Sequence, residues 1–183
     1  MTGIMTDSEL IEWASYGGII PFNSNNINPA SVDLTLSSEW RDAEYPARLF
    51  YSEHINLHPP SLTVYLKNLF GKKLWYTYVL ACTVEYITLP DDMAASIRLK
   101  TTPTREGLAH PIADWIDPGF NGQLTLMLHA NMPITVYCGD PIVQMVVYKL
   151  SKSVDKSYKE TGHYYDQKGP TPSWKRSQIP RND

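Results

Sequence analysis

The chain has 183 residues, of which 43% are hydrophobic, and it carries a formal net charge of −3. This length suits one domain with its own core, and the charge argues against a general binder of nucleic acid or anionic membranes. No apolar run reaches the roughly 18–20 residues of a membrane-spanning helix, and the first ten residues lack the pattern of a signal peptide. We therefore expect a cytoplasmic protein whose two cysteines, Cys82 and Cys138, stay reduced.

The first predicted element is a helix. Thr6 offers a side-chain oxygen at the N-cap and Glu9 a carboxylate three positions later, which is the pattern of a capping box. Gly17–Gly18 would end this helix. Beyond it, 12 tyrosines and 14 prolines in the chain favour strands and turns. Alternation of apolar and polar residues predicts strands in three stretches, 31–36, 79–87 and 124–128.

Two further strands are predicted before the periodicity stops. Residues 134–137 and 142–148 flank the turn-like sequence 138–141, and we interpret them as a hairpin. Residues 59–75 mix aromatic and basic side chains, and we interpret them as an insertion or an irregular strand pair.

The composition changes abruptly after Leu150, where lysine, serine, tyrosine, glycine and proline follow one another without periodicity. We therefore divide the chain into a β domain, residues 1–150, and a C-terminal tail, residues 151–183. Many short strands joined by turns are typical of a barrel or a sandwich.

Five segments occur in the order and spacing of a known family. They are Asn28–Leu34, Cys82–Asp92, Trp115–Phe120, Gly139–Gln144 and Gly169–Ser173. Together they resemble the dCTP deaminases, which share the fold of the trimeric dUTPases, a distorted jelly-roll β-barrel. The resemblance implies a mainly β homotrimer with a short N-terminal helix, whose active sites lie between subunits and are covered by C-terminal tails. It also implies a role in nucleotide metabolism with a pyrimidine deoxynucleoside triphosphate as ligand.

One family segment, of the form Arg-Ser-Ser-Leu-Ala-Arg, provides hydroxyl and guanidinium groups to the phosphates and the base. The matching sequence here is Lys-Thr-Thr-Pro-Thr-Arg. The resemblance implies that four of its residues bind the nucleotide: Lys100, Thr101, Thr102 and Arg105. Lysine lacks the planar fork of arginine, and the proline has no backbone N–H to donate, so the phosphates would be held differently. For Arg105 the alternative is a surface ion pair.

The deaminases of this family share a Gly-x-Ile-Thr-Leu-Glu-Leu pattern, whose glutamate activates water for attack on C4 of cytosine. The residue at that position here is Met127. A thioether cannot accept and return a proton usefully near neutral pH, so we expect deamination to be lost. The chain also lacks the ligand spacing of a zinc deaminase, and we expect no zinc. Our preferred interpretation is that Met127 fills the core from its strand.

Asp117 indicates a different reaction. In dUTPases and bifunctional deaminase-dUTPases, an aspartate in this Ile-Asp turn orients the water that hydrolyses the nucleotide between the α- and β-phosphates. The resemblance thus implies Asp117 as the catalytic base, with Mg²⁺ held through the phosphates and without direct protein ligands. Lys100, Arg105 and Gln144 would neutralise phosphate charge. Deaminases without this activity also carry the aspartate, and a turn-capping role before Pro118-Gly119 is the alternative.

The resemblance places Ala113, Asp114 and Trp115 in the nucleotide site, near the base. Family members often have a glycine or a neutral residue at the position of Asp114. A carboxylate there would accept a hydrogen bond from an amino or imino group of the base, or it would repel the usual ligand. His110 matches a family histidine at a turn, and we favour a structural role for it.

The tail also matches the family. Tyr164, Gln167 and Gly169–Ser173 correspond to the segment that folds over the triphosphate, and Lys168 fills a frequently basic position. A closing tail of this kind excludes water and completes the site. The alternative is a tail that is merely solvated.

Three functions remain open. The first is a Mg²⁺-dependent diphosphatase that acts on dUTP or a related pyrimidine nucleotide, with Asp117 as base. The second is a non-catalytic trimer that binds a nucleotide or sequesters a cyclic signalling nucleotide. The third is a dCTP deaminase whose base has moved to another side chain such as Asp114. None of them involves nucleic acid or a membrane as partner.

Overall fold

Strands β4 (Ser31–Asp42) and β7 (Tyr78–Thr88) form the centre of the fold. The computed structural model describes residues 2–42, 47–61, 75–111 and 113–177. The other strands are β1 (Gly3–Ile4), β2 (Ile19–Ile20), β3 (Ile27–Asn28), β5 (Leu49–Tyr51), β6 (His54–Leu57), β8 (Met93–Leu99), β9 (Leu108–Ala109), β10 (Trp115–Ile116), β11 (Asn121–Ala130), β12 (Ile134–Tyr137) and β13 (Pro141–Lys149). The helical segments are α1 (Asp7–Trp13), a π-helical turn (Ala14–Gly18), a 3₁₀ turn (Ser24–Asn26), α3 (Thr101–Arg105), α4 (Tyr158–Thr161) and α5 (Trp174–Ser177).

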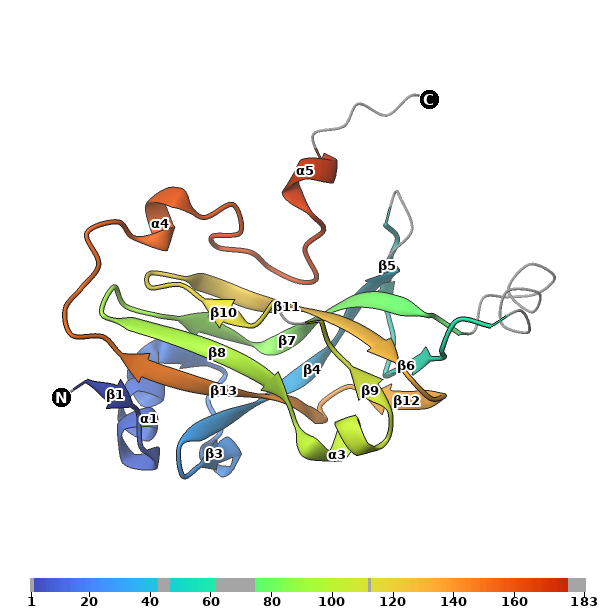
Figure 1. Ribbon diagram of the computed structural model, residues 1–183, viewed down its shortest axis with the longest axis horizontal. Helices are drawn as coiled ribbons and strands as arrows, with labels where there is room; N and C mark the ends of the chain where they lie inside the picture. Colours follow the sequence, from blue (N-terminus) through green and yellow to red (C-terminus); the bar gives the residue numbers. More distant parts are fainter. Residues whose placement is uncertain (1, 43–46, 62–74, 112, 178–183) are drawn as a thin grey trace.

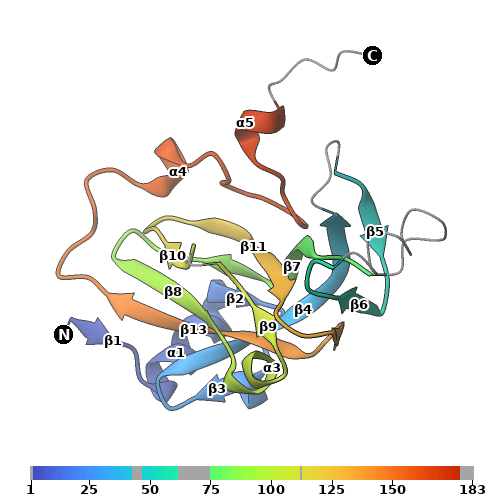
Figure 2. The same cartoon turned by 45° about the vertical axis from the view of Figure 1, so that its right-hand side comes forward.

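The long strands belong to one curled antiparallel sheet. Seven of its 11 strands follow the order β10-β8-β13-β4-β7-β11-β9, and the other four pair with interior strands: β1 with β13, β2 with β7, and β3 and β5 with β4. The sheet curls over itself as a half-barrel, with α1 at one end and the tail crossing above β10 and β11 (Figures 1 and 2). The prediction of a mainly β, barrel-like fold with a short N-terminal helix is therefore confirmed. Within the described residues, no helix is long and apolar enough to cross a membrane.

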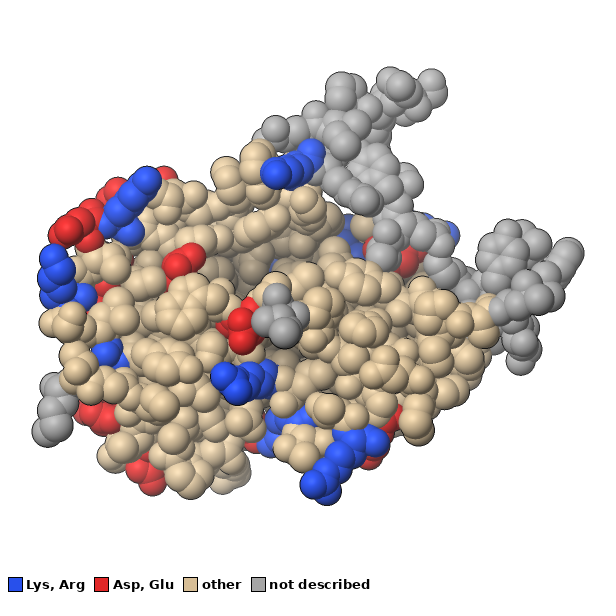
Figure 3. Space-filling model, in the orientation of Figure 1, with Lys and Arg blue, Asp and Glu red and all other residues tan. Residues whose placement is uncertain are grey.

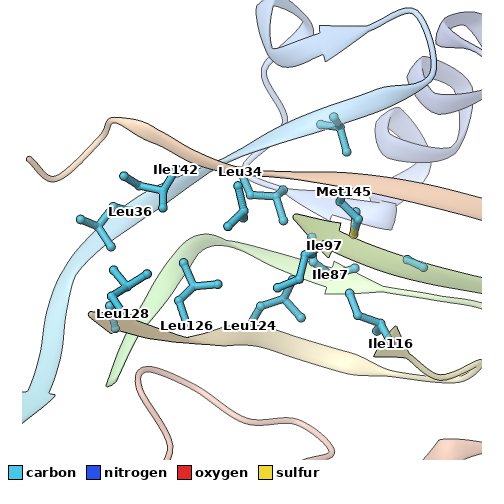
Figure 4. Close-up of a cluster of buried hydrophobic side chains, with 14 of the residues drawn as sticks. Leu34, Leu36, Ile87, Ile97, Ile116, Leu124, Leu126, Leu128, Ile142 and Met145 are labelled. Carbon is cyan, nitrogen blue, oxygen red and sulfur yellow. The ribbon is translucent and has the colours of Figure 1, made fainter. Parts of the chain in front are cut away.

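Alternate residues of the strands fill the space inside the curl. Leu124, Leu126 and Leu128 of β11 are buried, and Figure 4 shows them opposite Leu34 of β4 and Ile142 of β13. Each fully buried aliphatic side chain of this size contributes roughly 1.5–3 kcal/mol relative to exposure. The core is thus made by the inner faces of the two halves of the sheet, and the outer faces are left for other contacts.

The N-terminal helix begins as predicted. Thr6 is the N-cap, and its backbone N–H donates to Oε2 of Glu9 at 2.9 Å within a complete capping box. Glu9 Oε1 also accepts a hydrogen bond from Lys149 Nζ at 2.9 Å, which ties α1 to β13. The helical segment ends at Gly18, where a Cβ would lie 2.3 Å from the Trp13 ring. The predicted glycine end is confirmed, and the second of the two glycines is required by this close packing.

The predicted hairpin near the end of the core is wrong. Residues 134–137 form β12, but β12 pairs with β6, whereas β13 pairs with β4 and β8. The turn between them is held by β4, because Gly139 N donates to Leu36 O at 2.8 Å and Leu36 N donates to Asp140 O at 3.0 Å. These long-range bonds redirect the chain from the small sheet to the large one.

The two cysteines are free thiols, as predicted. Cys82 is buried and Cys138 is half-buried, and burial raises the pKa of the Cys82 thiol to about 11, so that it stays protonated near neutral pH. Most of the predicted insertion at 59–75 lies outside the described residues.

The ion pair and hydrogen bonds of Glu9 predict a pH-dependent stability. The Thr6 backbone N–H and the Lys149 ammonium lower the pKa of Glu9 from 4.5 to about 2. Because the folded pKa is the lower one, the contribution to stability is present above pH 4.5 and is lost as the pH falls through 2. We expect Glu9→Gln to lower the Tm at pH 7, and the difference from wild type to shrink toward zero near pH 2, in thermal unfolding followed by circular dichroism.

Glu12→Gln provides the matched control, because Glu12 is an exposed carboxylate on the same helix. It should change the free energy of unfolding by less than about 0.5 kcal/mol. A Tm difference for Glu9→Gln that is the same at pH 2 and pH 7 would contradict the assigned role of the carboxylate.

Candidate active site

Asp117 opens a tight turn between β10 and β11. Phe120 N donates to Asp117 O at 3.2 Å, and Gly119 at the third position has a φ of 81°, which with Pro118 at the second position is the pattern of a type II turn. The Asp117 side chain is exposed, and its Oδ1 accepts a hydrogen bond from Trp115 Nε1 at 3.0 Å. The carboxylate is therefore oriented by an indole, and the backbone of the turn is closed without it.

The N-terminal part of the tail fastens this turn from outside. Tyr158 N at the start of α4 donates to Pro118 O at 2.9 Å. A Cβ on Gly119 would lie 2.0 Å from Ser157 Oγ and 2.7 Å from Asp91 Oδ1, so only glycine fits between the tail and the β7–β8 connection. The tail is thus part of the structure that positions Asp117.

The predicted phosphate segment directly follows β8 and forms the N-cap, Lys100, and the residues of the short helix α3. Lys100 pairs with the buried Asp33 of β4, whose other oxygen accepts from Asn28 Nδ2 at 2.9 Å. Thr101, Thr102 and Arg105 are exposed on α3. The structure therefore leaves the two threonines and Arg105 accessible to a ligand, but it gives Lys100 a protein partner.

Gln144 lies beside this ion pair. Its position on β13 is in register with Asp33 of β4 on one side and with Arg98 of β8 on the other. On the face shown in Figure 3, basic and acidic side chains are interspersed and do not merge into a basic field. A ligand phosphate at this place would meet a few separate donors.

The Asp117 turn and the phosphate segment with α3, which carry the two groups of predicted site residues, are separated within one chain. Ile116, next to Asp117, pairs with Ala95 of β8, whereas Lys100 follows the end of the same strand. Five residues of extended chain span about 17 Å. Figures 1 and 2 also place α3 on the opposite side of the sheet from α4 and α5. Asp117 and α3 of one chain therefore do not form a single compact site.

The interpretation of Met127 as a core residue is wrong. Burial along β11 alternates strictly, and Met127 lies on the half-exposed outer face, between Thr125 and His129. The inner positions belong to Leu126 and Leu128, which are fully buried. The periodicity of the strand already contained this information, because residues two apart share a face; the apolar character of methionine suggested the wrong side.

The distal part of the tail docks on the same outer face. Gln123 N donates to Gln167 O at 3.0 Å, and Gln167 Nε2 donates to Gln123 O at 2.6 Å. Further along, Gly169 N donates to Gln123 Oε1 at 2.7 Å and Thr171 N donates to Thr125 Oγ1 at 3.1 Å. The tail thus covers the part of β11 directly before Met127, and Gln167 is the predicted tail residue that makes the contact.

The other two predicted tail residues do not contact β11 in this way. The Tyr164 hydroxyl accepts a hydrogen bond from Trp174 N at 3.3 Å, which holds the tail against itself. Lys168 is exposed. Lys168 is therefore accessible to solvent, whereas Tyr164 is half-buried within the tail.

Two histidines, His110 and His129, lie near Met127, and only His110 was considered from the sequence. His110 Nε2 and His129 Nδ1 are buried and have no hydrogen-bond partner among the described residues. Burial lowers the pKa of His110, and the nearby His129 acts in the same direction, while the backbone of Pro111 and the charge of Asp114 oppose them. His110 is therefore neutral near pH 7. His129 carries no family signal, and only its position on the outer face of β11 reveals it.

The predicted base-binding residues Ala113 and Asp114 directly precede β10, which pairs with β8. Asp114 is half-buried, and its backbone carbonyl accepts a hydrogen bond from Ile97 N at 2.9 Å. Ala113 is exposed, and its N–H donates to Pro111 O at 2.9 Å. These bonds hold the backbone of Ala113 and Asp114 directly before Trp115.

Comparisons with known proteins identify the family. A family profile described as dCTP deaminase-like matches residues 75–150. The dCTP deaminase, dUMP-forming, of Rhodococcus jostii is 34% identical over 93% of this chain and 95% of that protein. The chain belongs to the dCTP deaminase family. The family protein of the same description from Dictyoglomus thermophilum is 31% identical over 93% of both chains, and the one from Mycobacterium avium is 34% identical over 85% of this chain and 86% of that protein.

A solved family structure supports the same fold. The crystal structure of 2'-deoxycytidine 5'-triphosphate deaminase from Agrobacterium tumefaciens superposes with a TM-score of 0.64 at 19% identity. The match covers 81% of this chain and 48% of that one, so the chain spans about half the length of that solved structure. At this identity the likeness concerns the fold alone, and it agrees with the curled sheet described above.

The packing of Gly119 leads to a test of how the tail holds the Asp117 turn. We expect Gly119→Ala to destabilise the protein by about 1–3 kcal/mol more than backbone strain alone, because its Cβ would overlap Ser157 Oγ. Gly139→Ala is the control, since Gly139 has a similar φ of 88° but no atom within 4 Å of an added Cβ. Chemical denaturation and limited proteolysis of the tail measure the effect.

Equal losses of stability in the two glycine variants, with an equally protected tail, would show that the contact with Ser157 is unimportant. Ser157→Ala combined with Gly119→Ala should recover part of the lost stability, because it removes the overlapping oxygen.

Proposed function

We propose that the protein is a Mg²⁺-dependent diphosphatase that cleaves dUTP or a related pyrimidine deoxynucleoside triphosphate without deaminating it. The observation that carries the proposal is the contrast between Asp117 and Met127. Asp117 keeps an exposed carboxylate with one oxygen held at 3.0 Å by Trp115. Met127 occupies the position of the family's deaminating glutamate, on the outer face of β11, with a side chain that cannot carry a proton.

The reaction of the relatives has two parts, and Asp117 and Met127 concern one part each. Formation of dUMP from dCTP requires two hydrolytic changes: replacement of the 4-amino group by oxygen and removal of diphosphate. In the second change, Asp117 would accept the proton of a water that attacks the α-phosphorus, and diphosphate would leave. A positioned acid–base group typically supplies a factor of roughly 10²–10⁴ in rate. The present chain keeps Asp117 for the removal of diphosphate, and it has Met127 in place of the glutamate for the replacement of the amino group.

Assembly would bring the separated residues together. Because Asp117 and α3 are far apart along β8, a triphosphate at Asp117 would receive Thr101, Thr102 and Arg105 from another copy of the chain. We infer a homotrimer with sites between subunits, as the family resemblance implies. Gln144 and Lys100 would then support the phosphate site, with Lys100 shared between the ligand and Asp33.

Magnesium fits such a site as a partner of the phosphates. Within the described parts of the chain, no group of three or more His, Cys, Asp and Glu residues could hold a metal ion. A hard divalent cation would accordingly take its oxygen ligands from the triphosphate and water, and it would neutralise phosphate charge. The protein's own task is to hold the nucleotide and to orient the water through Asp117.

Two other functions each have one observation in their favour. The ion pair with Asp33 leaves Lys100 with less of its charge for a phosphate, which favours a protein that binds a nucleotide or a cyclic signalling nucleotide without cleaving it. Asp114 lies close enough to His110 to influence its pKa, which favours a deaminase with a relocated base. We rank both below the diphosphatase.

The decisive assay separates products from binding. The protein is incubated with Mg²⁺ and dUTP, dCTP or dTTP, and diphosphate, ammonia and bound nucleotide are each measured. We expect diphosphate from dUTP, no ammonia from dCTP, and a loss of roughly 10²–10⁴-fold in rate for Asp117→Asn. The control is Asp140→Asn, because Asp140 is an exposed aspartate in another glycine turn and should leave the rate unchanged.

Tight binding of a nucleotide without either product would replace the proposal with sequestration. Ammonia from dCTP in the wild-type protein would instead favour a relocated base, and Asp114→Asn would then identify it.

A second assay examines whether the lost glutamate is sufficient to explain the lost reaction. We expect Met127→Glu to release no ammonia from dCTP, because Asp114 and the Lys100–Arg105 segment also differ from the family pattern. Met127→Gln introduces a side chain with the shape of glutamate but without its charge, and it serves as the control. Robust ammonia release by Met127→Glu alone would show that the rest of the pocket is still that of a deaminase.

A further inference from the structure

We propose that Trp115 is a positioning residue for Asp117, which holds the carboxylate in the orientation that the hydrolytic water requires. The inference rests on the proposed function, because it concerns the same carboxylate. Trp115 and Asp117 are two positions apart at the end of β10, so their side chains project to the same side of the strand. The indole Nε1–H donates to Asp117 Oδ1 at 3.0 Å.

The hydrogen bond leaves half of the carboxylate available. Among the described residues, none donates a hydrogen bond to Asp117 Oδ2, and the side chain is exposed. The terminal torsion of an aspartate is otherwise broad, so a free carboxylate turns over a wide range. Fixing Oδ1 restricts this rotation and directs Oδ2 to one place. That is the arrangement a base needs to accept a proton from a bound water.

Trp115 is itself held by a neighbouring aromatic side chain. Its ring stacks on Tyr148 of β13 with centroids 5.9 Å apart and an interplanar angle of 29°. The Tyr148 hydroxyl lies 3.1 Å from Ser96 Oγ. The two residues of β8 in register with Tyr148 and Trp115 are small and buried, Ala94 and Ser96. These small side chains leave room for the indole to reach across β8.

The exposure of Trp115 supports a role beyond packing. Its exposed fraction is 58%, so burial of the indole contributes little to the core. The backbone of the turn is fixed independently, by Pro118 O with Tyr158 N and by the fit of Gly119 against Ser157. Asp117 is thus held at its backbone by the turn and the tail, and at its tip by Trp115.

The test removes the indole N–H and keeps the ring. Trp115→Phe retains an aromatic surface on Tyr148, and replacement of Trp115 by benzothienylalanine, in which sulfur replaces the N–H, retains the full shape. We expect both to lower kcat for diphosphate release by roughly 10- to 100-fold, as for a small misplacement of a reacting group, and to leave KM within about twofold. Tyr16→Phe, at an exposed tyrosine of the N-terminal helical segment that takes no part in the site, is the control and should keep wild-type kinetics.

Three outcomes of the kinetic test are distinct. A loss of activity in Asp117→Asn together with unchanged kcat in both Trp115 variants would overturn the positioning role while the proposed function stands. A raised KM at unchanged kcat would assign Trp115 to direct ligand contact and would also overturn it. Full activity in Asp117→Asn would contradict the proposed function itself.

A measurement without turnover keeps the inference testable in every case. In protein labelled with ¹⁵N at the tryptophan indoles, the Trp115 N–H signal should shift and exchange faster with solvent in Asp117→Ala, while the signals of Trp13 and Trp40 stay in place. An unchanged Trp115 signal would show that the hydrogen bond to Asp117 does not form in solution.

Discussion

Strict alternation along β11 is the constraint on which the rest of the structure depends. Leu124, Leu126 and Leu128 point inward, where they close the core of the curled sheet. The residues that alternate with them must then point outward, and they include Gln123, which receives the tail, and Met127. A shift of one residue would exchange the two sets. The packing of the core therefore decides which side chain faces the tail-covered surface, and here that side chain is a thioether.

The same strand connects core packing to the proposed chemistry. β11 begins directly after the Asp117 turn, and its outer face carries the tail from Gln123 to Thr125. The tail also supplies Ser157 and Tyr158 to the turn. One segment thus contacts both the turn that carries Asp117 and the outer face of β11 directly before Met127. We infer that loss of the deaminating glutamate changed one half of a two-step site and left the tail-supported half in place.

Local patterns predicted the local features well. The capping box of Thr6 and Glu9 and the alternation of β11 concern residues within a few positions of one another, and their geometry follows from the backbone alone. The hairpin of β12 and β13 failed because its partner choice depends on contacts of the turn with Leu36, about a hundred positions away. The partner of Lys100 is Asp33, 67 positions distant, and no motif indicated the pair.

The arrangement of the candidate residues could not be predicted from the sequence. The resemblance suggested Asp117, Gln167 and Arg105 as site residues, but the distance of α3 from the Asp117 turn emerged only from the strand register. The alternation of β11 already predicts that Met127 lies on the outer face. The prediction of a core position was wrong because it followed the hydrophobic character of methionine. The hydrogen bond of Trp115 to Asp117 links two neighbouring residues, yet it required side-chain coordinates.

The central claim, that diphosphate release and deamination are separated in this chain, is tested most directly by the product formed from dCTP. The protein is incubated with Mg²⁺ and dCTP labelled with ¹⁵N at the 4-amino group, and nucleotides are identified by mass spectrometry beside a parallel reaction with dUTP. The account predicts dUMP and diphosphate from dUTP, and from dCTP only labelled dCMP or unchanged dCTP. Appearance of dUMP or dUTP from dCTP, with labelled ammonia, would contradict it.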